Sequence, residues 1–103
     1  SDYAAAKGAI TTGLLLSLKN EVSRLGHVRV NAVAPGWTLT EKKAESGLDE
    51  EVMQRAKSTM ALKKLATPND VAQAIVSLAS DKESGHITGQ VIEVAGGMEG
   101  RLV

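Results

Sequence analysis

The sequence contains no cysteine and no phenylalanine, and only one tyrosine and one tryptophan. The absence of cysteine excludes a disulfide framework, a thiolate metal site and a cysteine nucleophile, and it agrees with the cytoplasmic location that we expect. Charge of one sign is not in excess, since 12 basic residues balance 12 acidic ones, so we expect neither a nucleic-acid partner nor a membrane surface. The longest apolar run, around residues 13–16, is too short to span a bilayer.

What is present fits one small packed domain. The chain has 103 residues, of which 43% are hydrophobic, and this length suits a single domain. The first residues already follow a helical pattern and lack a basic leader, so we expect no signal peptide and a true start further upstream. His27 and His86 are far apart and lack metal-ligand spacing, so we expect no metal site.

A long helix followed by a strand is predicted for the first third of the chain. Apolar residues recur at helical spacing and form one stripe, namely Ile10, Leu14, Leu18, Val22 and Leu25. A helix over residues 2–25 follows, and Gly26 is its expected stop. Residues 28–34 are short and β-branched and precede Pro35 and Gly36, which predicts a buried strand.

Residues 37–65 form the polar and charged part of the chain, with one short helix predicted in it. Asp49 is the expected N-cap of this helix, because Glu50 and Glu51 follow it in the first turn, where the helix dipole favours acids. Leu48 and Met53 have the spacing of a hydrophobic staple.

A second helix and a second strand are predicted beyond residue 65. Thr67 is the expected N-cap of the helix, Pro68 its first residue and Asp70 the partner in a capping box. Residues 84–89 are typical of a loop, and residues 90–95 are typical of a strand closed by a Gly-Gly turn.

The predicted order is helix, strand, insertion, helix, strand. Two strands joined by a helical crossover are parallel, so the sequence predicts an α/β fold. A sheet of two strands is marginal by itself, so either further strands precede this segment or copies of the chain associate. Ligands bind at the carboxyl ends of the strands in such sheets, which makes residues 35–40 the best-placed binding loop. A plain turn at the end of a strand also fits Pro35 and Gly36.

Tyr3 and Lys7 stand four residues apart and therefore share one face of the first predicted helix. A phenol has an ordinary pKa of about 10, and a neighbouring ammonium stabilises the phenolate and lowers that pKa. The pair is therefore suited to exchange a proton with a carbonyl or alcohol oxygen. Taken alone, the same pair also fits two residues that merely decorate a helix surface.

Four segments in a fixed order favour the catalytic interpretation. YAAAK at residues 3–7, VRVNAVAPGWTLT at 28–40, TPNDVAQAIVSLAS at 67–80 and HITGQVIEVAGG at 86–97 together resemble the carboxyl-terminal half of the short-chain dehydrogenase/reductase family. The resemblance covers nearly the whole chain. It implies the distal part of a Rossmann-like, doubly wound parallel sheet that is incomplete alone, with residues 1–103 as the carboxyl-terminal part of a single domain.

The resemblance also implies roles for individual residues. Tyr3 would be the catalytic acid/base of an oxidoreductase, and Lys7 would lower its pKa and contact the nicotinamide ribose. The cofactor would be NAD or NADP, and the substrate a carbonyl compound or an alcohol. The implied cofactor-binding residues are Tyr3, Lys7, Pro35, Gly36, Thr38 and Thr40.

The family pattern has three further implications for this chain. Residues 37–65 would form its substrate lid, and residues 2–25 would pack between subunits of a homo-oligomer. The glycine-rich phosphate loop and the catalytic serine and asparagine of the family belong upstream of the tyrosine, and none stands in these 103 residues. We therefore expect the chain alone to be inactive and to bind the cofactor poorly. The alternative is a non-catalytic, self-associating α/β module without a cofactor site.

Overall fold

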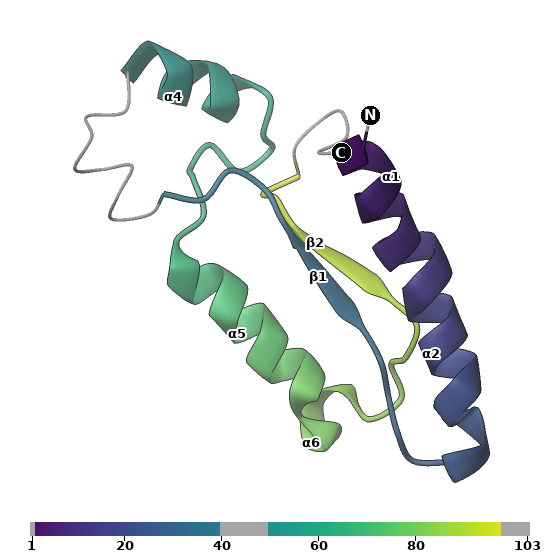
Figure 1. The fold of residues 1–103 in the computed structure, drawn as a ribbon. Helices are drawn as coiled ribbons and strands as arrows, with labels where there is room; N and C mark the ends of the chain where they lie inside the picture. Colours follow the sequence, from purple (N-terminus) through teal and green to yellow (C-terminus); the bar gives the residue numbers. More distant parts are fainter. Residues whose placement is uncertain (1, 40–49, 98–103) are drawn as a thin grey trace.

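The chain folds into three layers around a small parallel sheet. In the computed structural model, which describes residues 2–39 and 50–97, the sheet lies between a long helical rod and helix α5 (Figure 1). Strand β1, Ala32–Pro35, pairs with strand β2, Val91–Val94, in parallel. The register places Ala32 opposite Val91 and Pro35 opposite Val94. The predicted α/β arrangement with parallel strands is confirmed.

The helical rod covers residues 2–25, as predicted, but it is not a regular α-helix throughout. It consists of α1, Asp2–Gly8, a π-helical segment, Ala9–Leu14, α2, Leu15–Val22, and a 3₁₀ turn, Ser23–Leu25. Gly26 ends the rod with a φ of 76°, and its N–H donates to the carbonyl oxygen of Ser23 at 3.0 Å. This left-handed conformation favours glycine, which explains why the rod stops there.

The π-helical segment has a local cause in two threonines. The Thr11 hydroxyl donates to the carbonyl oxygen of Lys7 at 3.1 Å, and the Thr12 hydroxyl donates to that of Gly8 at 2.7 Å. Hydroxyls that bond back in this way compete with the backbone for the same carbonyls and distort helices. The glycine at position 13 adds to the effect because it favours the helix weakly.

The rod rests on the sheet through a face next to the predicted apolar stripe. Leu15 is its buried residue, at 4% exposure, whereas Ile10, Leu14 and Leu25 are 49–55% exposed. Val22 is half-buried. Successive residues of a helix are about 100° apart around its axis. Because the rod packs with Leu15 toward the sheet, most of the stripe that contains Leu14 faces outward.

Both predicted strands are shorter in the structure than in the sequence interpretation. Residues 28–31 run beside residues 87–90 but are joined to them largely by side chains. Asn31 Nδ2 donates to the carbonyl oxygen of Ile87 at 2.9 Å, and Asn31 Oδ1 accepts from the Gln90 N–H at 3.0 Å. The Val30 N–H donates to the Thr88 hydroxyl at 3.0 Å. These side-chain bonds replace the regular ladder, so β1 begins at Ala32 rather than at residue 28.

Three further helices complete the described chain. They are α4, Glu50–Ser58, α5, Pro68–Ala79, and α6, Asp81–Ser84. The capping box of α5 is confirmed: Asp70 N–H donates to the Thr67 hydroxyl at 3.1 Å, and Thr67 N–H donates to Asp70 Oδ2 at 2.8 Å. Helix α6 is absent from the sequence prediction, and its last residue falls in the predicted loop. Residues 48 and 49, the expected staple and N-cap of α4, lie outside the described residues.

Much apolar surface stays uncovered. Ile75 and Val76 of α5 are 52% and 59% exposed. The radius of gyration is 15.9 Å, whereas a compact domain of this length has about 13 Å. A two-stranded sheet with exposed apolar helix faces is therefore an incomplete layer structure.

Candidate active site

The carboxyl ends of both strands, the start of α1 and helix α4 lie at the same end of the molecule (Figure 1). The loop after β1 leaves the sheet there. Gly36 N–H donates to the carbonyl oxygen of Val94 at 2.9 Å, so this loop starts from a fixed point on β2. Residues 35–38 therefore occupy the position at which open α/β sheets bind ligands.

The loop after β1 is held by its own threonine and by the segment that precedes α5. Thr38 Oγ1 donates to the carbonyl oxygen of Gly36 at 3.0 Å. Ala66 N–H donates to the carbonyl oxygen of Trp37 at 3.1 Å, and Leu39 N–H donates to that of Ala66 at 2.8 Å. Thr38 and Trp37 are half-buried. The backbone of residues 36–39 is thus fixed at the end of the sheet, as a binding loop requires.

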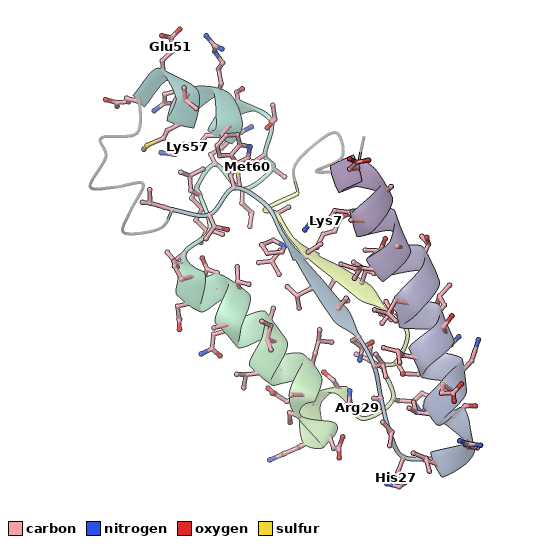
Figure 2. All side chains as sticks on the ribbon, in the orientation of Figure 1. Lys7, His27, Arg29, Glu51, Lys57 and Met60 are labelled. Carbon is pink, nitrogen blue, oxygen red and sulfur yellow. The ribbon has the colours of Figure 1, made fainter. Side chains whose placement is uncertain are left out.

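Helix α1 carries the two residues predicted to be catalytic. Lys7 lies in the last turn of α1, is exposed, and extends from the helix toward the sheet near the carboxyl ends of its strands (Figure 2). Tyr3 lies in the first turn of the same helix. The side chain of Tyr3 and the whole of Thr40 are outside the described residues. Of the six predicted site residues, the structure brings Lys7, Pro35, Gly36 and Thr38 to one end of the sheet.

The opposite end of the sheet also carries polar side chains, and their contacts have a structural role. Arg29, 13% exposed, donates to Asp81, to the carbonyl oxygen of Leu78 at 2.8 Å and to that of Ile87 at 3.2 Å. Two open clefts nearby share His27, Arg29 and Asp81 in their linings. His27 is exposed and its Nδ1 lies 2.8 Å from the carbonyl oxygen of Leu25. Neither cleft is lined by Pro35 or Gly36, and Arg29, which precedes β1, connects the end of α5 to the loop before β2.

The described residues include a carboxyl group whose pKa is lowered by its contacts, and this group lies in a helix cap. The backbone N–H of Thr67, and next its hydroxyl, hold the pKa of Asp70 below its ordinary value, and Lys64 adds to the shift. Among residues 2–39 and 50–97, no three His, Cys, Asp or Glu side chains are grouped as metal ligands would be. In the same part of the chain, no helix has the length and apolarity needed to cross a membrane.

Sequence reasoning missed the anchoring of α4. Met60, just beyond α4, is 2% exposed, and it lies between that helix and the strand ends (Figure 2). From the sequence, Met60 fits an apolar position in either a lid or a core, and its neighbours in the chain do not indicate which. Met60 lies against the Gly-Gly turn at residues 96–97, which is distant from it in the sequence.

Known proteins similar to this chain are oxidoreductases. A family model described as enoyl-(acyl carrier protein) reductase matches residues 1–99. An uncharacterized oxidoreductase of Escherichia coli K12, YgfF, is 47% identical over 96 residues, which cover 93% of this chain and 37% of that protein. The 3-oxoacyl-[acyl-carrier-protein] reductase FabG of Thermotoga maritima is 40% identical over 101 residues, which cover 95% of this chain and 38% of FabG. The chain thus spans less than two fifths of the length of these relatives.

Solved structures give the same result. A 3-oxoacyl-[acyl-carrier protein] reductase from Brucella melitensis superimposes with a TM-score of 0.82 and 36% identity, covering 96% of this chain and 35% of that one. A 4-hydroxyisoleucine dehydrogenase in complex with NADH gives a TM-score of 0.80 and 31% identity, covering 96% and 40%. The two-stranded sheet is accordingly an incomplete Rossmann-like sheet. The chain belongs to the short-chain dehydrogenase/reductase family of oxidoreductases.

Proposed function

We propose that the protein containing this chain is an NAD(P)-dependent oxidoreductase that interconverts a carbonyl compound and an alcohol. The chain would supply the carboxyl-terminal half of its single catalytic domain. The observation that carries the proposal is the presence of Tyr3 and Lys7 on α1. Helix α1 starts at the end of the sheet where β1 is followed by a fixed loop. Residues 1–99 of the same chain match the family. The relatives are much longer, which leaves room upstream for a phosphate loop and a catalytic serine.

The described residues fit the nicotinamide end of the cofactor. An exposed ammonium at Lys7, which has three donors, suits the hydroxyls of a ribose. The fixed backbone of residues 36–38 suits a planar carboxamide, which needs donors and acceptors at set positions. A glycine-rich loop running into a helix N-terminus, which would hold the diphosphate, is not found in this sequence. The bound nicotinamide supplies or accepts the hydride.

The chain's own residues would handle the proton. In the direction of reduction, the hydroxyl of Tyr3 donates its proton to the carbonyl oxygen of the substrate, and in oxidation the phenolate takes it back. The ammonium of Lys7, four residues along the same helix face, stabilises the phenolate. The loop at Pro35 and Gly36 would keep the substrate and the cofactor at the end of the sheet.

A tyrosine variant tests this proposal. In the full-length protein, Tyr3→Phe is expected to abolish turnover while NADH or NADPH binding, followed by cofactor fluorescence, changes little. Lys7→Met should impair both turnover and cofactor binding. Lys19→Met is the matched control, because Lys19 lies on the same rod in α2, further from the strand ends, and should leave both readouts unchanged. Turnover by Tyr3→Phe at the original rate would refute the assignment.

The substrate is proposed at the level of its functional group. The similar proteins include enzymes named for 3-oxoacyl-[acyl-carrier protein] and for 4-hydroxyisoleucine, which share a carbonyl or hydroxyl group as the reacting centre. We propose a cytoplasmic location as well, which the absence of cysteine supports.

A second candidate function is a self-associating α/β module without catalysis. The observation that favours it is the outward stripe of the rod, where Leu14 is 54% exposed and Leu25 55%. Contiguous exposed apolar side chains of this kind mark interaction surfaces. In the catalytic proposal the same stripe contributes to a homo-oligomer. The candidates separate on the full-length protein: a subunit that associates but neither binds nor oxidises NADH supports the module, and turnover supports the enzyme.

A further inference from the structure

The best-buried apolar cluster in the described residues lies where α4 meets the turn that follows β2. Met60 is 2% exposed, Ala56 5% and Ala95 6%. Ala56 belongs to α4, Met60 stands two residues after the end of α4, and Ala95 directly follows β2. The sheet and the rod contribute one buried residue of this kind, Leu15. Helix α4 is therefore connected to the turn after β2 through the buried residue that follows it, Met60.

Two backbone hydrogen bonds join the segment after α4 to the turn after β2. The Leu62 N–H donates to the carbonyl oxygen of Gly96 at 2.8 Å, and the Ala61 N–H donates to that of Gly97 at 3.3 Å. The segment that follows α4 is thus bonded directly to the turn at the carboxyl end of β2.

Both the backbone conformation and the close neighbours favour glycine at the two positions of this turn. Their φ angles are 61° at Gly96 and 73° at Gly97, values that side chains disfavour. A Cβ added at Gly96 would also lie 2.8 Å from Met60 Cε, and one added at Gly97 would lie 2.8 Å from Ala61 Cβ. Real Cβ atoms do not approach other atoms this closely. At Gly96 the flexible end of the Met60 side chain can shift aside, whereas at Gly97 the Ala61 Cβ is fixed to its backbone, so the segment after α4 would have to move.

We propose that the turn of Gly96 and Gly97 positions α4 over the carboxyl end of the sheet and thereby sets the affinity for substrate. This inference rests on the proposed oxidoreductase function and on the expectation that residues 37–65, which include α4, form the substrate lid. The segment after α4 runs from this contact to Ala66, which is bonded to the loop at Trp37. One displacement at the turn would therefore reach both α4 and the binding loop. Met60, Ala61, Gly96 and Gly97 are positioning residues and take no part in the chemistry.

Gly97→Ala is the direct test, because its new Cβ meets a defined atom. In the full-length protein it should raise KM for the carbonyl substrate by about fivefold or more, since small misplacements near a site cost substantial binding. KM for the cofactor and the pH profile of kcat should stay within about twofold of the original. A merely structural defect would instead lower the amount of active enzyme and leave both KM values unchanged.

Two matched variants isolate the contact. The pair Gly97→Ala with Ala61→Gly removes the clashing Cβ and should bring the substrate KM back toward the original value. Gly26→Ala introduces alanine at a φ of 76° where no atom lies within 4 Å, so it carries the backbone cost alone and should leave KM unchanged. If Gly97→Ala does not fold, Ala61→Gly alone carries the test, because it loosens the same contact without a clash.

Amide hydrogen exchange provides a readout that does not need activity. The Ala61 and Leu62 amides, which donate to the turn, should exchange faster in Gly97→Ala and recover in the double variant. An active protein whose substrate KM is the same in Gly97→Ala would overturn the positioning role, as would a double variant no better than the single one. If the original protein shows no oxidoreductase activity, the proposed function fails. Unchanged exchange at Ala61 and Leu62 would then overturn the attachment of α4 as well.

Discussion

Replacing Arg29 by methionine is expected to destabilise the fold far more than replacing its ion-pair partner Asp81 by asparagine. The two side chains are 13% and 87% exposed. Arg29 Nε and Nη2 donate to Asp81 Oδ1 at 3.2 and 2.9 Å. Its Nη1 donates to two carbonyl oxygens, those of Leu78 at 2.8 Å and Ile87 at 3.2 Å. The ion pair with Asp81 is therefore exposed to solvent, whereas the hydrogen bonds to the two carbonyl oxygens are partly buried.

The expected magnitudes follow from these contacts. Breaking an exposed ion pair costs about 0.2–1 kcal/mol, which sets the value for Asp81→Asn. A hydrogen bond from a charged donor contributes about 1.5–3 kcal/mol. Ile87 keeps its bond from Asn31 Nδ2, whereas Leu78 lies in the last turn of α5, where carbonyls lack helical donors. Losing the bond to Leu78 and the favourable cation at the helix end gives about 2–4 kcal/mol for Arg29→Met.

Urea unfolding of both variants beside the original protein measures the difference. Methionine keeps the apolar stem of arginine, so packing changes little. Arg29→Lys retains the positive charge but loses the forked geometry, and should fall between the other two. Raising the salt concentration should reduce the effect of Asp81→Asn and leave most of that of Arg29→Met. Equal free-energy losses in the two variants would refute the reasoning, because the ion pair would then carry the stabilisation.

Two further predictions concern the cap of α5 and the outward stripe of the rod. Hydrogen bonds from Thr67 lower the pKa of Asp70 below 3.8, so its contribution to stability is full above pH 3.8 and is lost as the pH falls through the lowered value. The difference in Tm between the original protein and Asp70→Asn should therefore shrink on acidification, and a constant difference would contradict this. Leu14→Glu should prevent self-association in light scattering because it places a charge on the stripe, whereas Thr12→Glu, on another face, should not. An original protein that is monomeric would contradict the proposed homo-oligomer.

Features set by neighbouring residues were predictable from the sequence. The capping box of α5 needs only Thr67 and Asp70, three positions apart, and the structure has both of its bonds. Gly26 ends the rod for the same local reason, since its left-handed conformation is a property of one residue. The parallel sheet followed from the order of the elements, because a helical crossover leaves few alternatives.

Features set by distant partners were not predictable. Arg29 finds acceptors 49 to 58 residues away, and nothing near position 29 indicates them. The strand ends depend on where Asn31 and Thr88 replace the ladder by side-chain bonds. The catalytic roles of Tyr3 and Lys7 came from the family resemblance and stay predictions, as does the role of Thr40.

The placement of Pro35 at the end of β1 also bears on aggregation. The N–H of Ala32 donates to the carbonyl oxygen of Gln90, just before β2, and that of Gly36 donates to Val94, so by the alternation of a strand positions 33 and 35 face the outer edge. Proline has no N–H, which leaves Val33 as the one outward amide donor of β1. An edge with a single donor is a poor template for pairing with foreign strands. The β1 edge of this incomplete sheet thus disfavours pairing with foreign strands, whereas the helix stripe exposes large apolar side chains.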